Sequence, residues 1–258
     1  MAKKWAAFPH PDKAYAHDAA GLRKIWARLH RGDCEPPPKD PGALDAWRHY
    51  HAGEFADAVA AGRKAGGAAI NAAVKAQMIY ANYLEKSEKA KLALLEEAAG
   101  WAEARRHEAP KDANAHYLYA YALGRYSQGI SITTALAQGY GGKIKDALTT
   151  ALKLEPKHAD AHIAYGSYQA EIIDKVGGLM AGMTYGAKKD SALEHYQRAL
   201  KLIPDSAIAR VEYANGLIML FGKTRMADAE TLYKEAAACK PADAMERLDV
   251  ELARSELE

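Results

Sequence analysis

Two histidines lie four residues apart in the segment 158–162, which reads His-Ala-Asp-Ala-His. On a helix this spacing brings both imidazoles to one face, where they could share a metal ion. No glutamate follows His158, so the segment lacks the signature of a zinc protease. His162 also has the same position in a repeated pattern as His116 and Arg210, which favours a structural or groove role. His158 and His162 are therefore weak metal candidates, and the sequence predicts no metal and no other cofactor.

Two further patterns resemble nucleotide-binding or catalytic chemistry. Residues 137–143 end in Gly-Lys, as a phosphate-binding loop does, but Ile144 stands where that loop needs serine or threonine, and a helix is predicted before it instead of a strand. The hydroxyls of residues 127–134 could approach His116, yet hydroxyls in such segments usually bond nearby backbone or face water. No nucleophile with a base and an orienting acid is recognisable. We therefore predict no catalytic residue and no enzyme activity.

The elements that hold these residues are marked by a repeated phrase, Pro-x-x-Ala-x-Ala. It occurs at residues 110–115, 156–161 and 204–209. The segments before the last two closing prolines share alanine, tyrosine, alanine and proline at intervals of four, three and five residues: Ala192, Tyr196, Ala199, Pro204 and Ala229, Tyr233, Ala236, Pro241. A tandem array of helical hairpins explains this repetition.

The helical spacing of apolar residues divides the chain into three parts. Residues 1–41 contain a leading helix over 13–30 and a proline-rich linker. Residues 42–241 form the repeat array, and residues 242–258 form a capping helix with Met245, Leu248 and Leu252 on one face. The predicted hairpins span residues 42–65, 68–108, 112–155, 158–203 and 206–240. The expected fold is all-α, a right-handed superhelical solenoid of stacked antiparallel helix pairs.

Charge and composition exclude several classes of partner. The chain has 35 Lys and Arg against 33 Asp and Glu, and this interspersed formal charge of +2 predicts no nucleic-acid partner. No stretch has the roughly 18 uncharged apolar residues of a membrane span, and the start lacks the apolar core of a signal peptide. We therefore expect a cytoplasmic protein without membrane insertion, unless a targeting segment was removed. An oligomer is compatible with these features.

The repeated positions resemble the tetratricopeptide-repeat (TPR) motif. Its small and aromatic positions are matched at Ala207, Ala209, Tyr213, Ala214, Ala229, Tyr233, Ala236 and Pro241, and at Ala159, Ala161, Tyr165, Gly166, Ala192, Tyr196, Ala199 and Pro204. The resemblance covers roughly residues 42–241 and is strongest from Pro110 onward. It implies that alanines lie where helix backbones approach closely, and that aromatic rings fill the gap to the next hairpin.

The repeats depart from the usual TPR length at two inserts. Closing prolines lie 46, 48 and 37 residues apart, whereas the standard period is about 34. The additions, residues 137–143 and 182–188, each contain Tyr-Gly followed by a small residue and Lys. We expect an extended first helix followed by a flexible apolar loop in both, with five insert residues as candidate site residues: Tyr140, Lys143, Met180, Met183 and Tyr185.

Elongated repeats with Leu-Gly-Arg-Tyr at 123–126, after an Ala-His-Tyr helix start, resemble the regulator of microtubule dynamics family. The His-Tyr-x-x-Ala-Leu run at 195–200 and the Arg-Leu closing helix are similar to the T-component of tripartite ATP-independent periplasmic transporters. The first resemblance implies cytoskeletal or organelle contact. The second implies a lipid-anchored, ligand-handling periplasmic subunit.

The TPR resemblance also implies a concave groove lined by the first helix of each hairpin. The groove candidates are Asn114, Tyr117, Tyr121, Arg125, Asp160, Ser167, Glu171 and Asn215. Their mixed chemistry predicts a non-enzymatic scaffold that binds a peptide or helix of a partner protein. The alternative is a carrier whose inserts enclose a small ligand, which a pocket lined by Tyr121, Ile130 and Met180 would favour. A third reading is that the connectors or the leading helix fill the groove and make these residues core.

Overall fold

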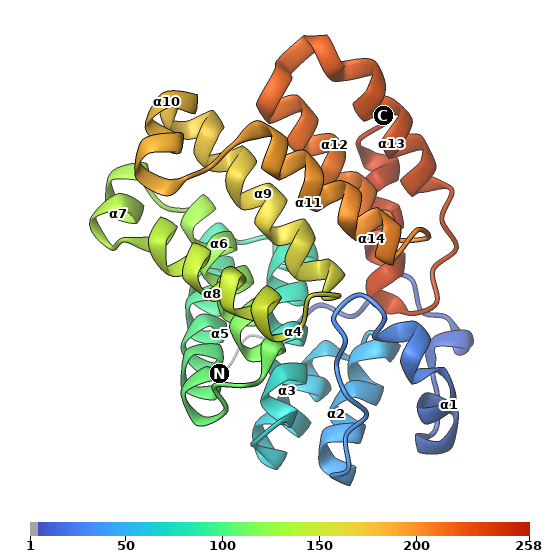
Figure 1. Ribbon diagram of the computed structural model, residues 1–258. Coiled ribbons are helices and arrows are strands. Elements are labelled where there is room, and N and C mark those ends of the chain that lie inside the picture. Colours follow the sequence, from blue (N-terminus) through green and yellow to red (C-terminus); the bar gives the residue numbers. More distant parts are fainter. Residues whose placement is uncertain (1–4) are drawn as a thin grey trace.

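The structure is a computed structural model that describes residues 5–258, so residues 1–4 of the predicted leading segment lie outside it (Figure 1). All regular elements in this range are helical. The α-helices are α1 Ala19–Leu29, α2 Pro41–Ala52, α3 Phe55–Ala65, α4 Ala69–Ile79, α5 Glu88–Glu108, α6 Ala113–Gln128, α7 Ile132–Ala137, α8 Tyr140–Leu154, α9 Ala159–Val176, α10 Gly178–Met180, α11 Lys189–Leu202, α12 Ala207–Phe221, α13 Met226–Ala237 and α14 Ala244–Ser255. Short 3₁₀ or π-helical turns are η1 Lys13–Tyr15, η2 Tyr80–Leu84, η3 Ala181–Tyr185 and η4 Gly222–Arg225.

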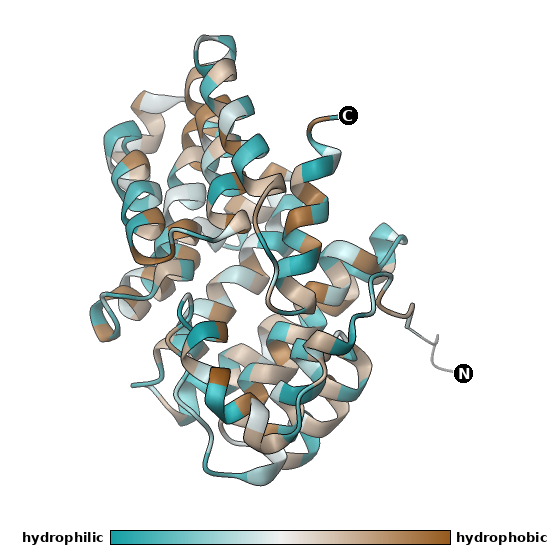
Figure 2. Ribbon diagram, turned by 90° about the vertical axis from the view of Figure 1, so that its right-hand side faces the viewer, coloured by the Kyte–Doolittle hydropathy of each residue, from teal (hydrophilic) through white to brown (hydrophobic). Residues whose placement is uncertain are grey.

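The helices stack as antiparallel pairs, and this confirms the predicted all-α solenoid. Helix α2 packs on α3, α4 on α5, α6 on α8, α9 on α11 and α12 on α13, while α14 covers the last pair. The pairs curve from α2 and α3 at one end of the molecule to α13 and α14 at the other (Figure 1). Figure 2 shows apolar and polar residues interspersed along the helices. Among the described helices, none combines the length and apolar character needed to cross a membrane.

The repeated phrase forms the start of a helix in each case. Its third residue caps the helix by accepting a hydrogen bond from the backbone N–H three residues later. The acceptor is a carboxylate at Asp112, an imidazole nitrogen at His158 and a hydroxyl at Ser206, over 3.1–3.2 Å. Each cap satisfies an N–H that the helix itself leaves free. The phrase therefore fixes the register at which each new pair begins.

The predicted alanine and tyrosine positions are buried contacts between helices. Tyr196 of α11 is 1% exposed, and its ring lies between Gly166 of α9 and Gly216 of α12. A methyl group added at Gly216 would lie 2.5 Å from a ring carbon of Tyr196, and one added at Gly166 would lie 3.0 Å away. Only glycine therefore allows the helix backbones to approach the ring this closely.

The two ends of the solenoid meet. Arg28 of α1 forms a 2.5 Å ion pair with Glu246 of α14, and His51 of α2 lies 2.6 Å from Asp243, the residue that caps α14. The segment after α1, predicted to be a linker, also packs onto later pairs. The backbone oxygen of Gly32 accepts from the Asp160 N–H at 3.1 Å. The concave face is thus closed on this side.

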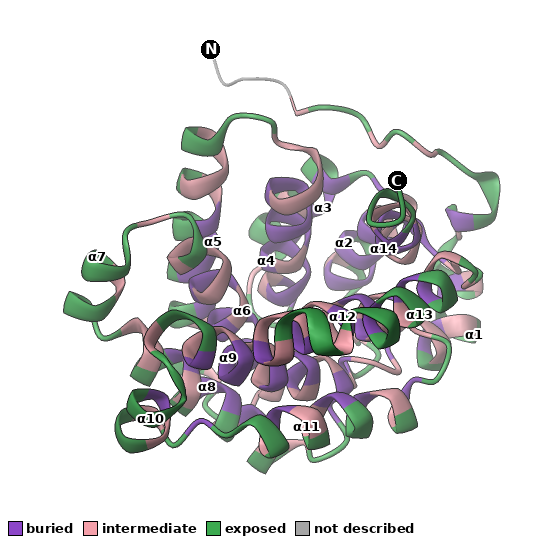
Figure 3. Cartoon of the chain, turned by 90° about the horizontal axis from the view of Figure 1, so that it is seen from above, coloured by how far each residue is buried: buried purple, intermediate pink, exposed green. Residues whose placement is uncertain are grey.

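Both inserts are helical, which corrects the expectation of extended first helices and flexible loops. Helix α6 stops at Gln128, a separate α7 is capped by Ser131, and α8 begins at Tyr140, so residues 140–143 belong to its first turn. The second insert lies in the π-turn η3, which follows the short α10 directly and is ended by Gly186 in the left-handed region. The inserts touch, because Lys145 donates to the backbone oxygen of Tyr185 at 2.7 Å. They form an exposed edge of the molecule (Figure 3).

Candidate functional site

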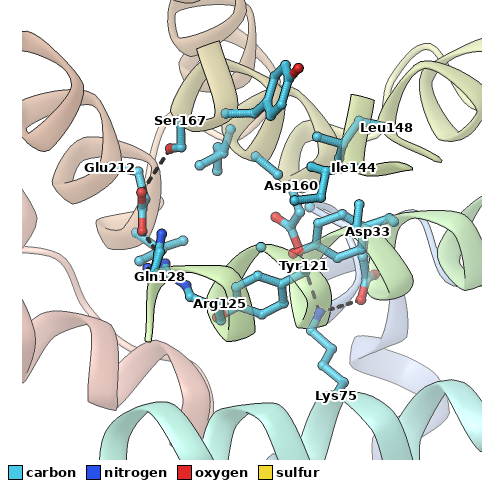
Figure 4. Close-up of a pocket in the computed structure, with 18 of the residues that line it drawn as sticks. Asp33, Lys75, Tyr121, Arg125, Gln128, Ile144, Leu148, Asp160, Ser167 and Glu212 are labelled. Atoms are coloured by element: carbon cyan, nitrogen blue, oxygen red, sulfur yellow. Dashed lines mark hydrogen bonds and ion pairs between the residues drawn. The ribbon is translucent and has the colours of Figure 1, made fainter. Parts of the chain in front are cut away.

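The concave face holds a cavity of about 490 Å³. Its walls come from α1, α2, α4, α6, α8, α9, α12 and α14, together with α7, η3 and the residues that follow α1. The first helices of successive pairs thus line it, as the TPR resemblance implied. Figure 4 shows part of this lining, with charged side chains from different helices converging on the hollow.

Six of the eight groove candidates line the cavity: Tyr117, Tyr121, Arg125, Asp160, Ser167 and Glu171. Asn114 does not, because it lies buried behind the lining, where it donates to the Asp33 backbone oxygen at 2.9 Å and contacts His158. Asn215 also lies outside the lining and accepts a hydrogen bond from the Tyr233 hydroxyl. These two residues hold helices together instead of facing the cavity.

The insert candidates divide in the same way. Tyr140 and Tyr185 line the cavity, whereas Lys143, Met180 and Met183 are exposed and do not. Of the three residues expected in an insert-enclosed pocket, Tyr121 and Ile130 are present and Met180 is absent from the lining. The inserts therefore supply one wall of the cavity and not a complete enclosure.

An ion-pair cluster in the lining was missed by sequence reasoning. Lys75 of α4 lies 2.6 Å from the Asp33 carboxylate and 3.6 Å from that of Asp160 (Figure 4). Burial opposes the charge of Lys75, but the two carboxylates raise its pKa well above the usual value. Burial raises the pKa of Asp160 to about 6, with Lys75 opposing the shift. The one available signal was a lysine inside the apolar run of residues 72–79.

A second polar cluster lies farther along α9. Arg125 pairs with Glu212 at 2.5 Å, and the Ser167 hydroxyl donates to the other Glu212 oxygen at 2.9 Å (Figure 4). The Tyr196 hydroxyl in turn donates to Ser167 at 3.0 Å, which links the repeat packing to the cavity wall. Glu171, one turn beyond, accepts from Gln128, and burial raises its pKa above the usual value.

The lining has two chemically different parts. Acidic side chains outnumber basic ones by eight to five: Asp33, Asp160, Glu171, Asp205, Glu212, Asp243, Glu246 and Asp249 against Arg28, Arg31, Lys75, Arg125 and Lys175. The side near the inserts is apolar and includes Ile130, Ile132, Leu136, Ile144, Leu148, Ile172 and Val176. The cavity thus offers an acid-rich floor and an apolar wall to one occupant.

The weak metal candidates have other partners. His158 caps α9 through one nitrogen and lies 3.0 Å from Asn114 through the other, and burial lowers its pKa to about 3. His162 contacts the Pro156 backbone oxygen at 3.1 Å, as His116 contacts Pro110 at 3.0 Å. The shared register of these two histidines therefore reflects a repeated contact with the closing proline. Within residues 5–258, one three-residue group has ligand-like spacing, His49, Glu54 and Asp57, at the surface.

Comparison with known proteins agrees with the fold and with one of the resemblances. A thermophilic TPR protein of Thermus thermophilus has a similar structure, with a TM-score of 0.56 and 17% sequence identity over 83% of this chain and 97% of that one. No curated protein matches the sequence significantly. The model of the family "Regulator of microtubule dynamics protein 1-3" matches residues 68–255, which include the first helices α4, α6, α9 and α12 that line the cavity. The chain therefore belongs to the regulator of microtubule dynamics protein 1-3 family.

Proposed function

We propose that this protein is a non-enzymatic interaction module that binds a short segment of a partner protein in its concave cavity. The observation that carries the proposal is the combination of an acid-rich floor and an apolar wall in one cavity. Tyrosine and arginine are enriched among the residues that anchor protein interfaces, and both line the cavity, at Tyr121 and Arg125. Helix-lined grooves of this kind bind peptides through a few such anchors.

The lining also defines the chemistry of the segment. The lining has three more carboxylates than cationic side chains, so a lysine or arginine side chain of the ligand would offset the excess negative charge. Asp160 and Glu171 are eleven residues apart on α9, so they mark a length of about 16 Å along its axis. An extended peptide of about five residues covers that length. The expected ligand therefore has one or two basic residues beside a large apolar one.

A peptide-display library selected on the purified protein tests this proposal. The selected peptides should share a basic residue next to an apolar residue. Glu171→Gln should then weaken their binding by about tenfold, measured by fluorescence anisotropy at pH 7.5, because a charge-assisted contact is lost. Glu194→Gln is the matched control, since Glu194 is exposed on α11 outside the cavity. Failure to select any sequence, or equal effects of both substitutions, would overturn the proposal.

A second candidate is the small-ligand carrier, which the closed ring of helices favours. The contacts of α14 with α1 and α2 turn an open groove into a cavity of about 490 Å³, within the usual size of small-molecule sites. Native mass spectrometry distinguishes the two functions. A co-purified small molecule that disappears in Ile144→Arg, with no peptide selected, would support the carrier.

A further inference from the structure

The inserts and the short helices that precede them, α7 and α10, carry most of the exposed large apolar side chains in the described part of the chain. Eight such side chains are exposed there, and five belong to α7, α10 and η3. Leu179 is 81% exposed and Met183 79%, while Met180, Ile132 and Leu136 are each at least half exposed. Soluble proteins seldom leave such side chains clustered in water without a use for them.

These side chains lie on one edge of the molecule, which we call the insert edge: α7, α10 and η3 with residues 139–145 and 186–189. The two inserts are joined there, since a methyl group at Gly141 would lie 2.8 Å from the Tyr185 ring. Figures 1 and 3 both show α7 and α10 on the same side, away from the helix pairs. The exposed apolar groups therefore belong to one surface.

The charge of the insert edge differs from that of the cavity. Residues 129–145 and 175–189 contain five lysines and no acidic residue, although Asp146, Asp174 and Asp190 follow directly outside these limits. Lys143 and Lys188 are exposed, whereas Lys175 lies in the cavity lining beside Glu171, Lys145 donates to the Tyr185 backbone oxygen and Lys189 donates to the Leu220 backbone oxygen. The whole chain has a formal charge of only +2, so the inserts are locally basic.

We propose that the insert edge docks on an anionic membrane surface without spanning it. Leu179 and Met183 would enter the headgroup region, and exposed Lys143 and Lys188 would contact anionic lipid headgroups. Protruding apolar side chains beside lysines fit a bilayer better than a protein partner, because lysine is depleted in protein interfaces. The proposal stands apart from peptide binding, since it uses exposed residues instead of the acid-rich floor.

Vesicle co-sedimentation tests the docking. The wild-type protein should sediment with vesicles of phosphatidylcholine mixed with phosphatidylserine, bind phosphatidylcholine alone far more weakly, and be released by high salt. Leu179→Ser/Met183→Ser and Lys143→Glu/Lys188→Glu should each reduce binding by about tenfold or more. The matched controls are Met226→Ser and Lys201→Glu, which change exposed residues outside the inserts and should bind as wild type does.

Two results would overturn the docking proposal. The first is a lack of specificity in the vesicle assay. The wild-type protein would bind both kinds of vesicle equally, or the two insert variants would bind the phosphatidylserine vesicles as well as wild type does. The second is self-association: analytical ultracentrifugation would show a dimer that Leu179→Ser/Met183→Ser converts to a monomer, with no vesicle binding in either form. Circular dichroism should give the same helix content for all variants, because the substituted side chains are exposed.

Discussion

Replacing Gly216 with alanine tests the packing that stacks the repeats. Gly216 lies in α12 against the ring of Tyr196, a buried residue whose hydroxyl is fixed by Ser167. The added methyl group would lie 2.5, 2.6 and 2.7 Å from three atoms of that side chain. These distances are shorter than any carbon contact allows, so the ring or the helix must move.

The size of the effect follows from two opposing terms. Alanine in the middle of a helix gains about 1 kcal/mol over glycine. Overpacking a well-filled contact costs about 1–3 kcal/mol, and the upper part of that range applies because Tyr196 is held on both sides, by Gly166 and Gly216. We expect Gly216→Ala to lower the free energy of unfolding by about 1–2 kcal/mol.

Urea denaturation followed by circular dichroism measures this change. Gly100→Ala is the matched control, because Gly100 also lies within a helix, α5, but a methyl group there has no neighbour within 4 Å. The control should raise the free energy of unfolding by up to about 1 kcal/mol. In a Tyr196→Leu background, Gly216→Ala should lose most of its cost. If Gly216→Ala stabilised the protein as Gly100→Ala does, our account of the repeat packing would be wrong.

Two further predictions concern the Lys75 cluster. The folded pKa of Asp160, about 6, lies above its usual 3.8, so its contribution to stability is complete below pH 3.8 and is lost as the pH rises through 6. Asp160→Asn should therefore gain up to about 3 kcal/mol relative to wild type between pH 4 and pH 7.5 in urea denaturation, and a pH-independent difference would contradict this. Lys75→Met should cost about 3–5 kcal/mol, because it leaves buried Asp33 without its 2.6 Å ion pair. Adding Asp33→Asn should recover part of that loss, and a double variant no more stable than the single one would refute the pairing.

The repeat architecture could be predicted from the sequence because its signals are local. A cap such as Ser206, an alanine at each close helix contact and a closing proline all act within one hairpin. Tyr196 shows the limit of such local signals. Its spacing in the repeat predicted that its ring is buried, but the sequence did not indicate that Gly166 of α9 and Gly216 of α12 contact the ring. Six groove candidates line the cavity, because the position of a residue on the first helix of its pair decides whether its side chain faces the concave side.

Two kinds of feature could not be predicted from the sequence: contacts between residues far apart in the chain, and the conformation of the insert glycines. The glycines of the inserts suggested loops, yet Gly139 and Gly186 adopt left-handed conformations that begin and end helical turns. Lys75 and Asp33 are 42 residues apart, and Arg28 and Glu246 are 218 apart. No local pattern links such residues, so the polar floor and the closed ring emerge only from the folded chain.

The closed ring connects the two proposed binding surfaces. His51 and Asp243 are almost fully buried where the ends of the solenoid meet, so opening that side would break this 2.6 Å contact. Ile132 and Leu136, by contrast, are half exposed and belong both to the cavity lining and to the insert edge. A ligand can reach the apolar wall past these two residues without breaking a buried ion pair. A membrane docked on the insert edge would therefore lie beside the part of the cavity that is easiest to open.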